Sequence, residues 1–442
     1  MISISEAFEI VERETVSLDA ETIDLNESIG RVLAREIRAD TDLPPFDRSQ
    51  MDGFALRTKD VEKASEKNPV KLKIAGESVA GKGFNRKIKQ GEAVRIMTGA
   101  RVSEGADAVQ KKELACEFKN AKGEIFVEIF QTTKAFQNIA LKGAEIKTGE
   151  KVFDKGEIIG AQMIAPLVSF GCAAVEVFQK PHVSILATGS EIVGVRETPK
   201  PDQIRDSNSW SLKAFAENAG ATVDVLPRVK DDFENLKSHI AKAVGLERQL
   251  RSTNDELRQK ENFKLQIPNS KIKNQSKIKN QKSKILILSG GVSVGDYDFT
   301  KPALRDLGAE IFFERVALCP GKPTVFARLN DCLIFALPGN PVSVAVTFFL
   351  FVRAAFLKMQ GAKNYKLKSG FAVLAEKIKG AKGRDSFLPA TIETNSKGKL
   401  IASVSFGGSS NFIAFARADC LVFVPRDENL EAGAVVKILF LP

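Results

Sequence analysis

Residues 179–362 alternate apolar runs with amphipathic stretches. The runs at 183–187, 285–288 and 333–336 do not alternate with polar residues, so they predict strands covered on both faces of a sheet. A further strand is predicted at 221–226, and helical periodicity follows at 206–216 and 341–357. Strands and helices in this order predict an α/β domain with a largely parallel sheet.

Two other regions contain short β-type runs separated by glycine turns. Residues 51–138 contain such runs at 70–75, 93–97, 108–112 and 125–129, which predict a small β domain. Residues 363–442 contain them at 371–376, 388–393, 400–404, 420–424 and 435–441, which predict a second.

The remaining segments, 1–50 and 139–178, have helical periodicity. Ser3 and Glu6 form a capping-box pair before an apolar stripe that ends at Val11. Further helices are predicted at 27–37 and 158–170. We interpret the two segments as one discontinuous domain with the first β domain inserted into it.

Residues 246–283 break the pattern. The hexapeptide Ser-Lys-Ile-Lys-Asn-Gln occurs twice in succession at 270–281, and such a polar, basic segment predicts a disordered surface insertion. Residues 246–284 carry a net charge of +7 of the chain's +10. A basic arm for RNA, DNA or an acidic partner is the alternative, but Phe263 is the single aromatic residue there. We therefore expect no nucleic-acid partner.

The composition limits the chemistry further. None of the five cysteines forms a Cys-x-x-Cys pair, which argues against zinc clusters and a disulfide framework and favours a cytoplasmic location. With two histidines in the chain, a bound metal is expected to be a hard cation held by oxygen. The uncharged run 332–352 contains Pro338 and Pro341, so it predicts a buried core helix and no membrane partner.

The strongest candidate chemistry follows the apolar run at 285–288. In the loop Ser289-Gly-Gly-Val-Ser-Val-Gly295, glycines let backbone N–H groups approach an anion closely. Asp296 and Asp298 follow at a spacing that suits Mg²⁺ against a phosphate. The alternative is a tight strand–helix turn with solvated acids.

Other polar loops follow the neighbouring strands, at the edge where open α/β sheets bind ligands. They contribute Thr188, Gly189 and Glu191, the pair Asp231-Asp232, Lys322, and Gly339 with Asn340. One residue of the aspartate pair is expected to cap the next helix, and the other to face a ligand. In the first β region, Asp47 and Asp52 lie on a loop stiffened by prolines, either solvated or directed into a cleft.

In combination these loops resemble a known family. Residues 43–55 read Leu-Pro-Pro-Phe-Asp-x-Ser-x-Met-Asp-Gly-Phe-Ala, which is similar to a signature of the molybdopterin molybdenumtransferases, including MoeA-type proteins and the E domain of gephyrin. The resemblance continues through the following motifs and covers nearly the whole chain outside 246–283: Ile96–Ala100, Glu104–Ala108, Thr188–Glu191, Ser289–Gly295, Pro320–Pro323 and Leu337–Ser343.

The resemblance implies a homodimer of four-domain subunits. It implies an elongated helical discontinuous domain (1–50 and 139–178), an inserted β domain (51–138), a MogA-like α/β molybdopterin-binding domain (179–362) and a C-terminal β domain (363–442). The implied reaction inserts molybdate into adenylylated molybdopterin and releases AMP with Mg²⁺. Molybdopterin adenylyltransferase and molybdoenzyme acceptors are the implied partners.

The resemblance also implies roles for individual residues. The implied catalytic residues are Asp52, Thr98, Glu145, Glu191, Asp231 and Asp298, with Glu191, Asp231 and Asp298 holding the metal. The implied substrate-binding residues are Thr188, Gly189, Ser289, Gly290, Gly291, Ser293, Gly295, Lys322, Gly339, Asn340, Arg384 and Ser410.

Three positions depart from the family's usual residues. Ala140 stands where Arg is common, Glu145 where Asp is common, and Cys319 where Lys is common. The first and third changes each remove a positive charge that would face an anion; Arg101, Lys142 and Arg315 are candidates to compensate. The alternative function is a non-catalytic relative that binds molybdopterin as a carrier or scaffold.

Overall fold

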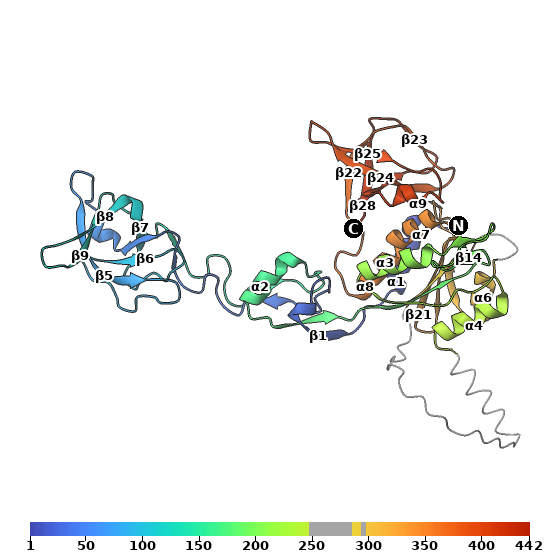
Figure 1. Ribbon diagram of the computed structural model, residues 1–442, viewed down its shortest axis with the longest axis horizontal. Helices are drawn as coiled ribbons and strands as arrows, with labels where there is room; N and C mark the ends of the chain where they lie inside the picture. Colours follow the sequence, from blue (N-terminus) through green and yellow to red (C-terminus); the bar gives the residue numbers. More distant parts are fainter. Residues whose placement is uncertain (247–284, 293–297) are drawn as a thin grey trace, which may run out of the picture. The chain divides into compact units, whose positions relative to one another are not determined.

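The computed structural model describes residues 1–246, 285–292 and 298–442, and the chain in it folds as two compact units (Figure 1). Unit 1 comprises Met1–Arg35, Lys155–Ala161 and Ala174–Pro442, and unit 2 comprises Glu36–Asp154 and Gln162–Ala173. The predicted insertion from residue 247 onward, as well as Ser293, Gly295 and Asp296, lies outside the described residues. The boundaries expected for four domains stay predictions.

Unit 1 contains the predicted α/β sheet. Its six strands have the order β16-β13-β17-β21-β20-β18, in which the first four are parallel and β20 and β18 are antiparallel to their neighbours. β17 is a central strand, as the sequence predicted. The strands are β13 (His182–Ala187), β16 (Thr222–Val225), β17 (Ile285–Ser289), β18 (Glu310–Phe313), β20 (Val325–Leu329) and β21 (Cys332–Leu337).

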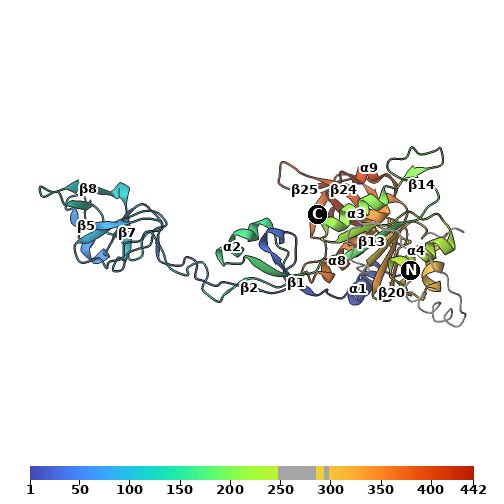
Figure 2. The ribbon, with the colours of Figure 1, turned by 60° about the horizontal axis from the view of Figure 1, so that its bottom comes forward.

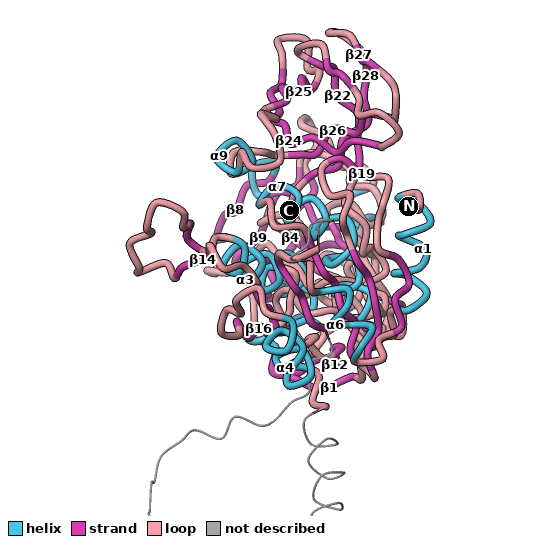
Figure 3. Tube along the Cα trace, turned by 90° about the vertical axis from the view of Figure 1, so that its right-hand side faces the viewer, coloured by secondary structure: helices cyan, strands magenta, loops and turns pink. Residues whose placement is uncertain are grey.

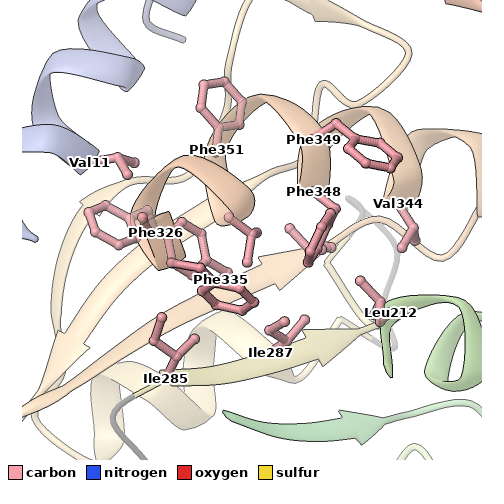
Figure 4. Packing of buried hydrophobic residues seen from close by; sticks show 14 of the residues in the cluster. Val11, Leu212, Ile285, Ile287, Phe326, Phe335, Val344, Phe348, Phe349 and Phe351 are labelled. Carbon is pink, nitrogen blue, oxygen red and sulfur yellow. The ribbon is translucent and has the colours of Figure 1, made fainter. Parts of the chain in front are cut away.

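Helices cover both faces of this sheet, which explains the unbroken apolar runs. Ile285 and Ile287 of β17 pack in a core with α1, α3 and the helix that follows β21 (Figure 4). Leu286 and Leu288 face the opposite core, with α4 and α6. The helices are α1 (Ile4–Glu14), α3 (Asn208–Asn218), α4 (Phe233–Ala243), α6 (Thr300–Asp306), α7 (Pro341–Thr347), the π-helical turn η5 (Phe348–Val352) and α8 (Arg353–Met359).

The helix Pro341–Met359 lies in the core of unit 1. It is the single helix in the described residues that is long and apolar enough to cross a membrane, and 83% of its most apolar window is buried inside the protein. Phe348 and Phe351 are fully buried and pack over the sheet (Figure 4). This packing confirms the predicted core helix.

The C-terminal β domain belongs to unit 1 and forms a sheet of order β19-β24-β25-β22-β28-β26 (Figure 3). An additional pairing joins β26, the last strand of this order, to β24, the second. All five strands predicted between residues 371 and 441 are confirmed. The sheet comprises β19 (Leu318–Cys319), β22 (Ser369–Leu374), β24 (Asp385–Thr394), β25 (Leu400–Val404), β26 (Cys420–Val424) and β28 (Val435–Phe440).

Unit 2 contains the other predicted β domain, with the strand order β7-β4-β6-β5-β9-β8 (Figure 2). The chain segments before β4 and after β9 pair with each other in two short ladders, β3 with β10 and β2 with β11. The strands are β2 (Ile37–Arg38), β3 (Arg48–Ser49), β4 (Gly53–Leu56), β5 (Val70–Ser78), β6 (Glu92–Ile96), β7 (Ala108–Lys111), β8 (Ala115–Lys119), β9 (Ile125–Ile129), β10 (Ile139–Ala140) and β11 (Lys151–Phe153).

One predicted helix is wrong and another is shorter than predicted. Residues 27–37 form no helix: after a 3-10 turn, Val32 and Leu33 run extended and bridge Ile158 and Val177. Both side chains are buried, so contacts on an extended segment produced the apolar spacing that resembled a helix. In 158–170 the helical residues are η4 (Ala161–Met163) and α2 (Ile164–Ser169).

The remaining elements are short. The two-stranded pairs are β1 (Ala20–Asp24) with β12 (Ala174–Phe178), β14 (Ile192–Val193) with β15 (Ile204–Arg205), and β23 (Ile378–Lys379) with β27 (Asn429–Leu430). The short helical turns are η1 (Leu25–Glu27), η2 (Thr58–Val61), η3 (Lys112–Leu114) and α9 (Phe412–Phe415).

Candidate functional site

A cavity of about 340 Å³ lies at the carboxyl ends of β13, β17 and β21 in unit 1. The loop after each of these strands supplies part of its wall. The lining residues are Thr188, Gly189 and Glu191 after β13, Asp231 after β16, Gly290, Gly291, Val292 and Asp298 after β17, Pro338, Gly339 and Asn340 after β21, and Pro323. The structure therefore brings together loops that are more than 100 residues apart in the sequence, as predicted.

The two adjacent aspartates after β16 have different roles. Asp232 caps α4, because its Oδ1 accepts a hydrogen bond of 2.7 Å from the backbone N–H of Asn235. Asp231 lines the cavity, and its carboxylate accepts hydrogen bonds from the Thr188 hydroxyl (2.9 Å) and the Ser190 backbone N–H (3.0 Å). Asp231 thus ties the loop after β13 to the loop after β16.

Only glycine fits at position 290. Its φ is +95°, and a Cβ there would lie 2.3 Å from the carbonyl oxygen of Thr188. A Cβ on Gly291, at φ +61°, would lie 3.0 Å from the side chains of Thr188 and Thr300. The loop after β17 therefore packs directly on the loop after β13, which leaves the backbone of both at the cavity wall.

Asp298 is the most enclosed acid of the cavity. Its side chain is 7% exposed, and its Oδ2 lies 2.9 Å from the Lys301 ammonium. Burial raises the pKa of this carboxyl above its ordinary value, and Lys301 opposes part of that rise. The ionised form of such a buried carboxylate is stabilised by a bound cation, and its neutral form by a proton from a ligand.

A second cavity, of about 700 Å³, adjoins the first and shares Thr188, Glu191, Gly290, Gly339 and Asn340 with it. Its lining includes the predicted residues Ser289 and Ser410, and the first residues of α3 and α7. Helix N-termini favour anions, because their N–H groups lack partners within the helix.

Asn208 is a residue of this wall that the sequence did not single out. Its side-chain amide donates to the Ser289 hydroxyl (3.0 Å) and to the Gly339 carbonyl oxygen (2.7 Å). It therefore holds the loops after β17 and β21 together. A polar residue at the start of a predicted helix is normally interpreted as a helix cap, so the local sequence does not distinguish Asn208 from its neighbours.

Two predicted substrate-binding residues lie outside the walls of both cavities. Lys322 is exposed beside Pro323, which does line the first cavity. Arg384 is half-buried in the turn before β24. Neither appears among the lining residues.

Unit 2 has a cavity of its own, of about 700 Å³, which two of the other predicted residues line; the third, Asp52, is not part of the lining. Thr98 and Glu145 line it, and the Asp52 Oδ1 accepts hydrogen bonds of 2.8 Å from both the backbone N–H and the hydroxyl of Thr98. These bonds, with the nearby Lys112, lower the pKa of the Asp52 carboxyl. Asp47 instead accepts from the backbone N–H of Lys142, so it stabilises the loop.

The six predicted catalytic residues thus fall into two groups of three, one in each unit. Glu191, Asp231 and Asp298 line the first cavity of unit 1, whereas in unit 2 Thr98 and Glu145 line the cavity and Asp52 is hydrogen-bonded to Thr98 without being part of the lining. Within the described residues, no three His, Cys, Asp or Glu side chains are close enough to form a ready-made metal site.

Comparison with known proteins gives one consistent family. Residues 2–171 match "MoeA N-terminal region (domain I and II)", residues 260–358 match "Probable molybdopterin binding domain", and residues 372–441 match "MoeA C-terminal region (domain IV)". The chain is 32% identical over 442 residues to the molybdopterin molybdenumtransferase of Staphylococcus aureus strain COL, and 31% identical over 439 residues to that of Staphylococcus epidermidis strain RP62A. Each alignment covers 99% of this chain and 95% of the relative.

Solved structures agree with these matches. Two crystal structures of the molybdopterin biosynthesis MoeA protein from Pyrococcus horikoshii superpose with TM-scores of 0.76 and 0.78, at 29% and 27% identity. Both comparisons cover 100% of this chain, and 99% and 100% of the other. The predicted multidomain fold, an α/β domain with two small β domains, is confirmed, and the chain belongs to the molybdopterin molybdenumtransferase (MoeA) family of transferases.

Proposed function

We propose that this protein inserts molybdate into adenylylated molybdopterin and releases AMP, as a step of molybdenum cofactor biosynthesis. Membership of the family supports the pathway and the transferase class. The observation that carries the specific reaction is the cavity at the carboxyl ends of β13, β17 and β21, which is lined by three carboxylates and by three loops that contain glycine.

The wall of this cavity suits a phosphoanhydride. Glycine backbone at positions 291 and 339 brings N–H groups to the cavity wall where phosphate oxygens can reach them, whereas the Gly290 N–H donates to the Leu337 carbonyl oxygen. The N-terminus of α7 adds partial positive charge in the adjoining cavity, whereas at the start of α3 the Asp206 carboxylate of the same lining accepts a hydrogen bond from the Ser209 N–H. We assign the phosphates of the adenylylated substrate to this wall, and the larger, adjoining cavity to the rest of the molecule.

Glu191, Asp231 and Asp298 have the oxygen chemistry that Mg²⁺ prefers. Mg²⁺ is usually bound by one or two carboxylates together with substrate phosphates, so the absence of a three-ligand cluster among the described residues does not count against it. Bound there, the ion would neutralise charge on the phosphoanhydride. Asp231 is already oriented by Thr188 and Ser190, and so presents its carboxylate in a fixed direction.

The cavity of unit 2 is our candidate for molybdate insertion. Thr98 holds Asp52 in one orientation through two hydrogen bonds, and Glu145 lines the same cavity beside a cation. We further propose a cytoplasmic homodimer that takes its substrate from a molybdopterin adenylyltransferase and passes its product to molybdoenzymes, with no nucleic-acid or membrane partner. Light scattering of the purified protein tests the dimer.

The reaction is tested by incubating the protein with adenylylated molybdopterin, molybdate and Mg²⁺ and measuring AMP. We expect molybdate-dependent release, and a large loss in Asp298→Ala. No release by the wild-type protein, with Asp298→Ala indistinguishable from it, would remove the proposal. Pterin binding without turnover would identify the carrier function instead.

A further inference from the structure

Asp206 is a buried acid in the wall of the second, larger cavity of unit 1, of about 700 Å³. The residue is 8% exposed, and its Oδ1 accepts a hydrogen bond of 3.0 Å from the backbone N–H of Ser209, in the first turn of α3. Within the part of the chain that the structure describes, no other hydrogen bond and no ion pair reaches this carboxylate. A carboxylate has about four acceptor positions, so most of its capacity is left for a ligand in the cavity.

Phe412 is the single aromatic residue among the described residues that line this cavity. It begins α9 and is 49% exposed, whereas Phe415, one turn later, packs among the rings of the core. The loop before α9 is fixed as well, because the Ser409 hydroxyl accepts a hydrogen bond of 2.9 Å from the amide of Asn340, which lines the same cavity. The exposed part of the Phe412 ring is therefore held at the cavity wall, where a flat ligand can stack on it.

The adenylylated substrate has two flat heterocycles, an adenine and a pterin, and their hydrogen-bonding edges differ. The pterin presents its 2-amino group and its N3–H side by side, and these two donors match the two oxygens of a carboxylate. Adenine presents its 6-amino group beside N1, which is an acceptor, so a carboxylate would gain one hydrogen bond and face the lone pair of N1. The Asp206 carboxylate therefore favours the pterin over the adenine.

We propose that the larger cavity of unit 1 is the pterin subsite, in which Asp206 accepts hydrogen bonds from the 2-amino group and N3–H while Phe412 stacks on the ring. The inference rests on the proposed function, since it places one half of the adenylylated substrate. The Ser209 N–H fixes the direction of the carboxylate. Because a site built to pair with a ligand's donors rejects an analogue that lacks them, Asp206 determines specificity and Phe412 adds affinity.

Equilibrium dialysis with two probes tests the subsite: 6-hydroxymethylpterin, and 6-hydroxymethyllumazine, in which an oxo group replaces the 2-amino group. We expect the wild-type protein to bind the pterin about 10- to 100-fold more tightly, because the lumazine loses one hydrogen bond to a charged group and turns an acceptor toward the carboxylate. In Asp206→Asn this preference should disappear. The amide oxygen of the variant can still accept from the Ser209 N–H, so α3 keeps its first turn, but the amide NH2 group meets the donors of the pterin.

Phe412→Ala tests the stacking contact. Both probes should bind about tenfold more weakly, as expected when a base loses the aromatic side chain on which it stacks, and the preference for the pterin should remain. Ile413→Ala is the matched control, because Ile413 is the next residue of α9, is 64% exposed and lies outside the cavity lining. This control should bind both probes as the wild-type protein does.

The complete substrate provides the second measurement. Asp206→Asn should raise the KM for adenylylated molybdopterin about 10- to 100-fold and leave the inhibition constant of AMP unchanged, because AMP has no pterin. The inference is overturned if the wild-type protein does not distinguish the two probes, if Asp206→Asn retains the preference, or if AMP inhibition weakens as much as the KM rises, which would place the adenine in this cavity. The dialysis does not depend on turnover, so selective pterin binding without AMP release would keep the subsite and remove the proposed reaction.

Discussion

The adjacent residues Asp231 and Asp232 allow one carboxylate to be removed from the cavity and another, one position away, from a helix cap. Both variants, Asp231→Ala and Asp232→Ala, lose the same charge from the same loop. Because Asp231 lines the cavity and Asp232 caps α4, we expect Asp231→Ala to lower turnover, and Asp232→Ala to loosen the start of α4 without lowering turnover.

The magnitudes follow from the hydrogen bonds. Loss of an aspartate N-cap costs about 1 kcal/mol, which corresponds to about a fivefold increase in opening of the first turn of α4. Asp232→Ala should therefore leave AMP release within about twofold of wild type. Asp231→Ala breaks two bonds, to Thr188 and Ser190, worth about 1 kcal/mol each, and removes a carboxylate from the cavity. We expect turnover to fall at least about 100-fold, the larger share because a ligand for the Mg²⁺ that would neutralise the phosphoanhydride is lost.

Two assays on the same preparations check this. Hydrogen exchange followed by mass spectrometry reports on peptides that contain the first turn of α4, Phe233 to Leu236, and AMP release reports turnover. Faster exchange in α4 with normal turnover is expected for Asp232→Ala. If Asp232→Ala lost turnover as severely as Asp231→Ala, the division of roles between the two carboxylates would be refuted.

Three further predictions concern the walls of the two adjoining cavities of unit 1. Gly290→Ala should lower turnover at least about tenfold, and it should destabilise the protein by more than the roughly 1–2 kcal/mol of a left-handed alanine, because its Cβ would lie 2.3 Å from a backbone oxygen. Gly308→Ala is the control: its φ is +78° and nothing lies within 4 Å of its Cβ. This variant should lose only the roughly 1–2 kcal/mol of the backbone conformation and keep its turnover. Asn208→Ala should raise the KM for adenylylated molybdopterin about fivefold, since about 1 kcal/mol of loop positioning is lost, and an unchanged KM would contradict this role. Burial raises the pKa of Asp298 above its ordinary 3.8, so ionisation costs folding stability as the pH rises through the raised pKa. Asp298→Asn should therefore have a Tm at pH 7 no lower than wild type while losing turnover, and a Tm several degrees lower would contradict it.

The local pattern of apolar residues predicted most of the fold, because in most segments that pattern fits a single type of secondary structure. The run Ile285–Leu288 is buried on both faces, and its residues pack alternately in two cores. The segment 27–37 failed because Val32 and Leu33 are buried by partners more than 100 residues away in the sequence. Extended segments with such contacts show apolar spacings that period alone does not distinguish from a helix.

The sequence predicted which residues belong to the candidate site, but not the structural role of each one. The sequence indicated that one of Asp231 and Asp232 caps a helix, and the structure identifies Asp232. It gave no reason to select Asn208, because this residue joins two loops that are distant from it in the sequence. Cross-strand and loop–loop contacts of this kind depend on register, which a single sequence does not reveal.

The central claim is that the loops after β13, β17 and β21 form one phosphate-binding cavity. A crystal structure of the protein with AMP and Mg²⁺ tests it most directly. We expect the AMP phosphate within hydrogen-bond distance of the backbone N–H groups at Gly291 or Gly339, with the cation on Asp231 or Asp298. A phosphate bound elsewhere on the protein, with this cavity holding only water, would contradict it.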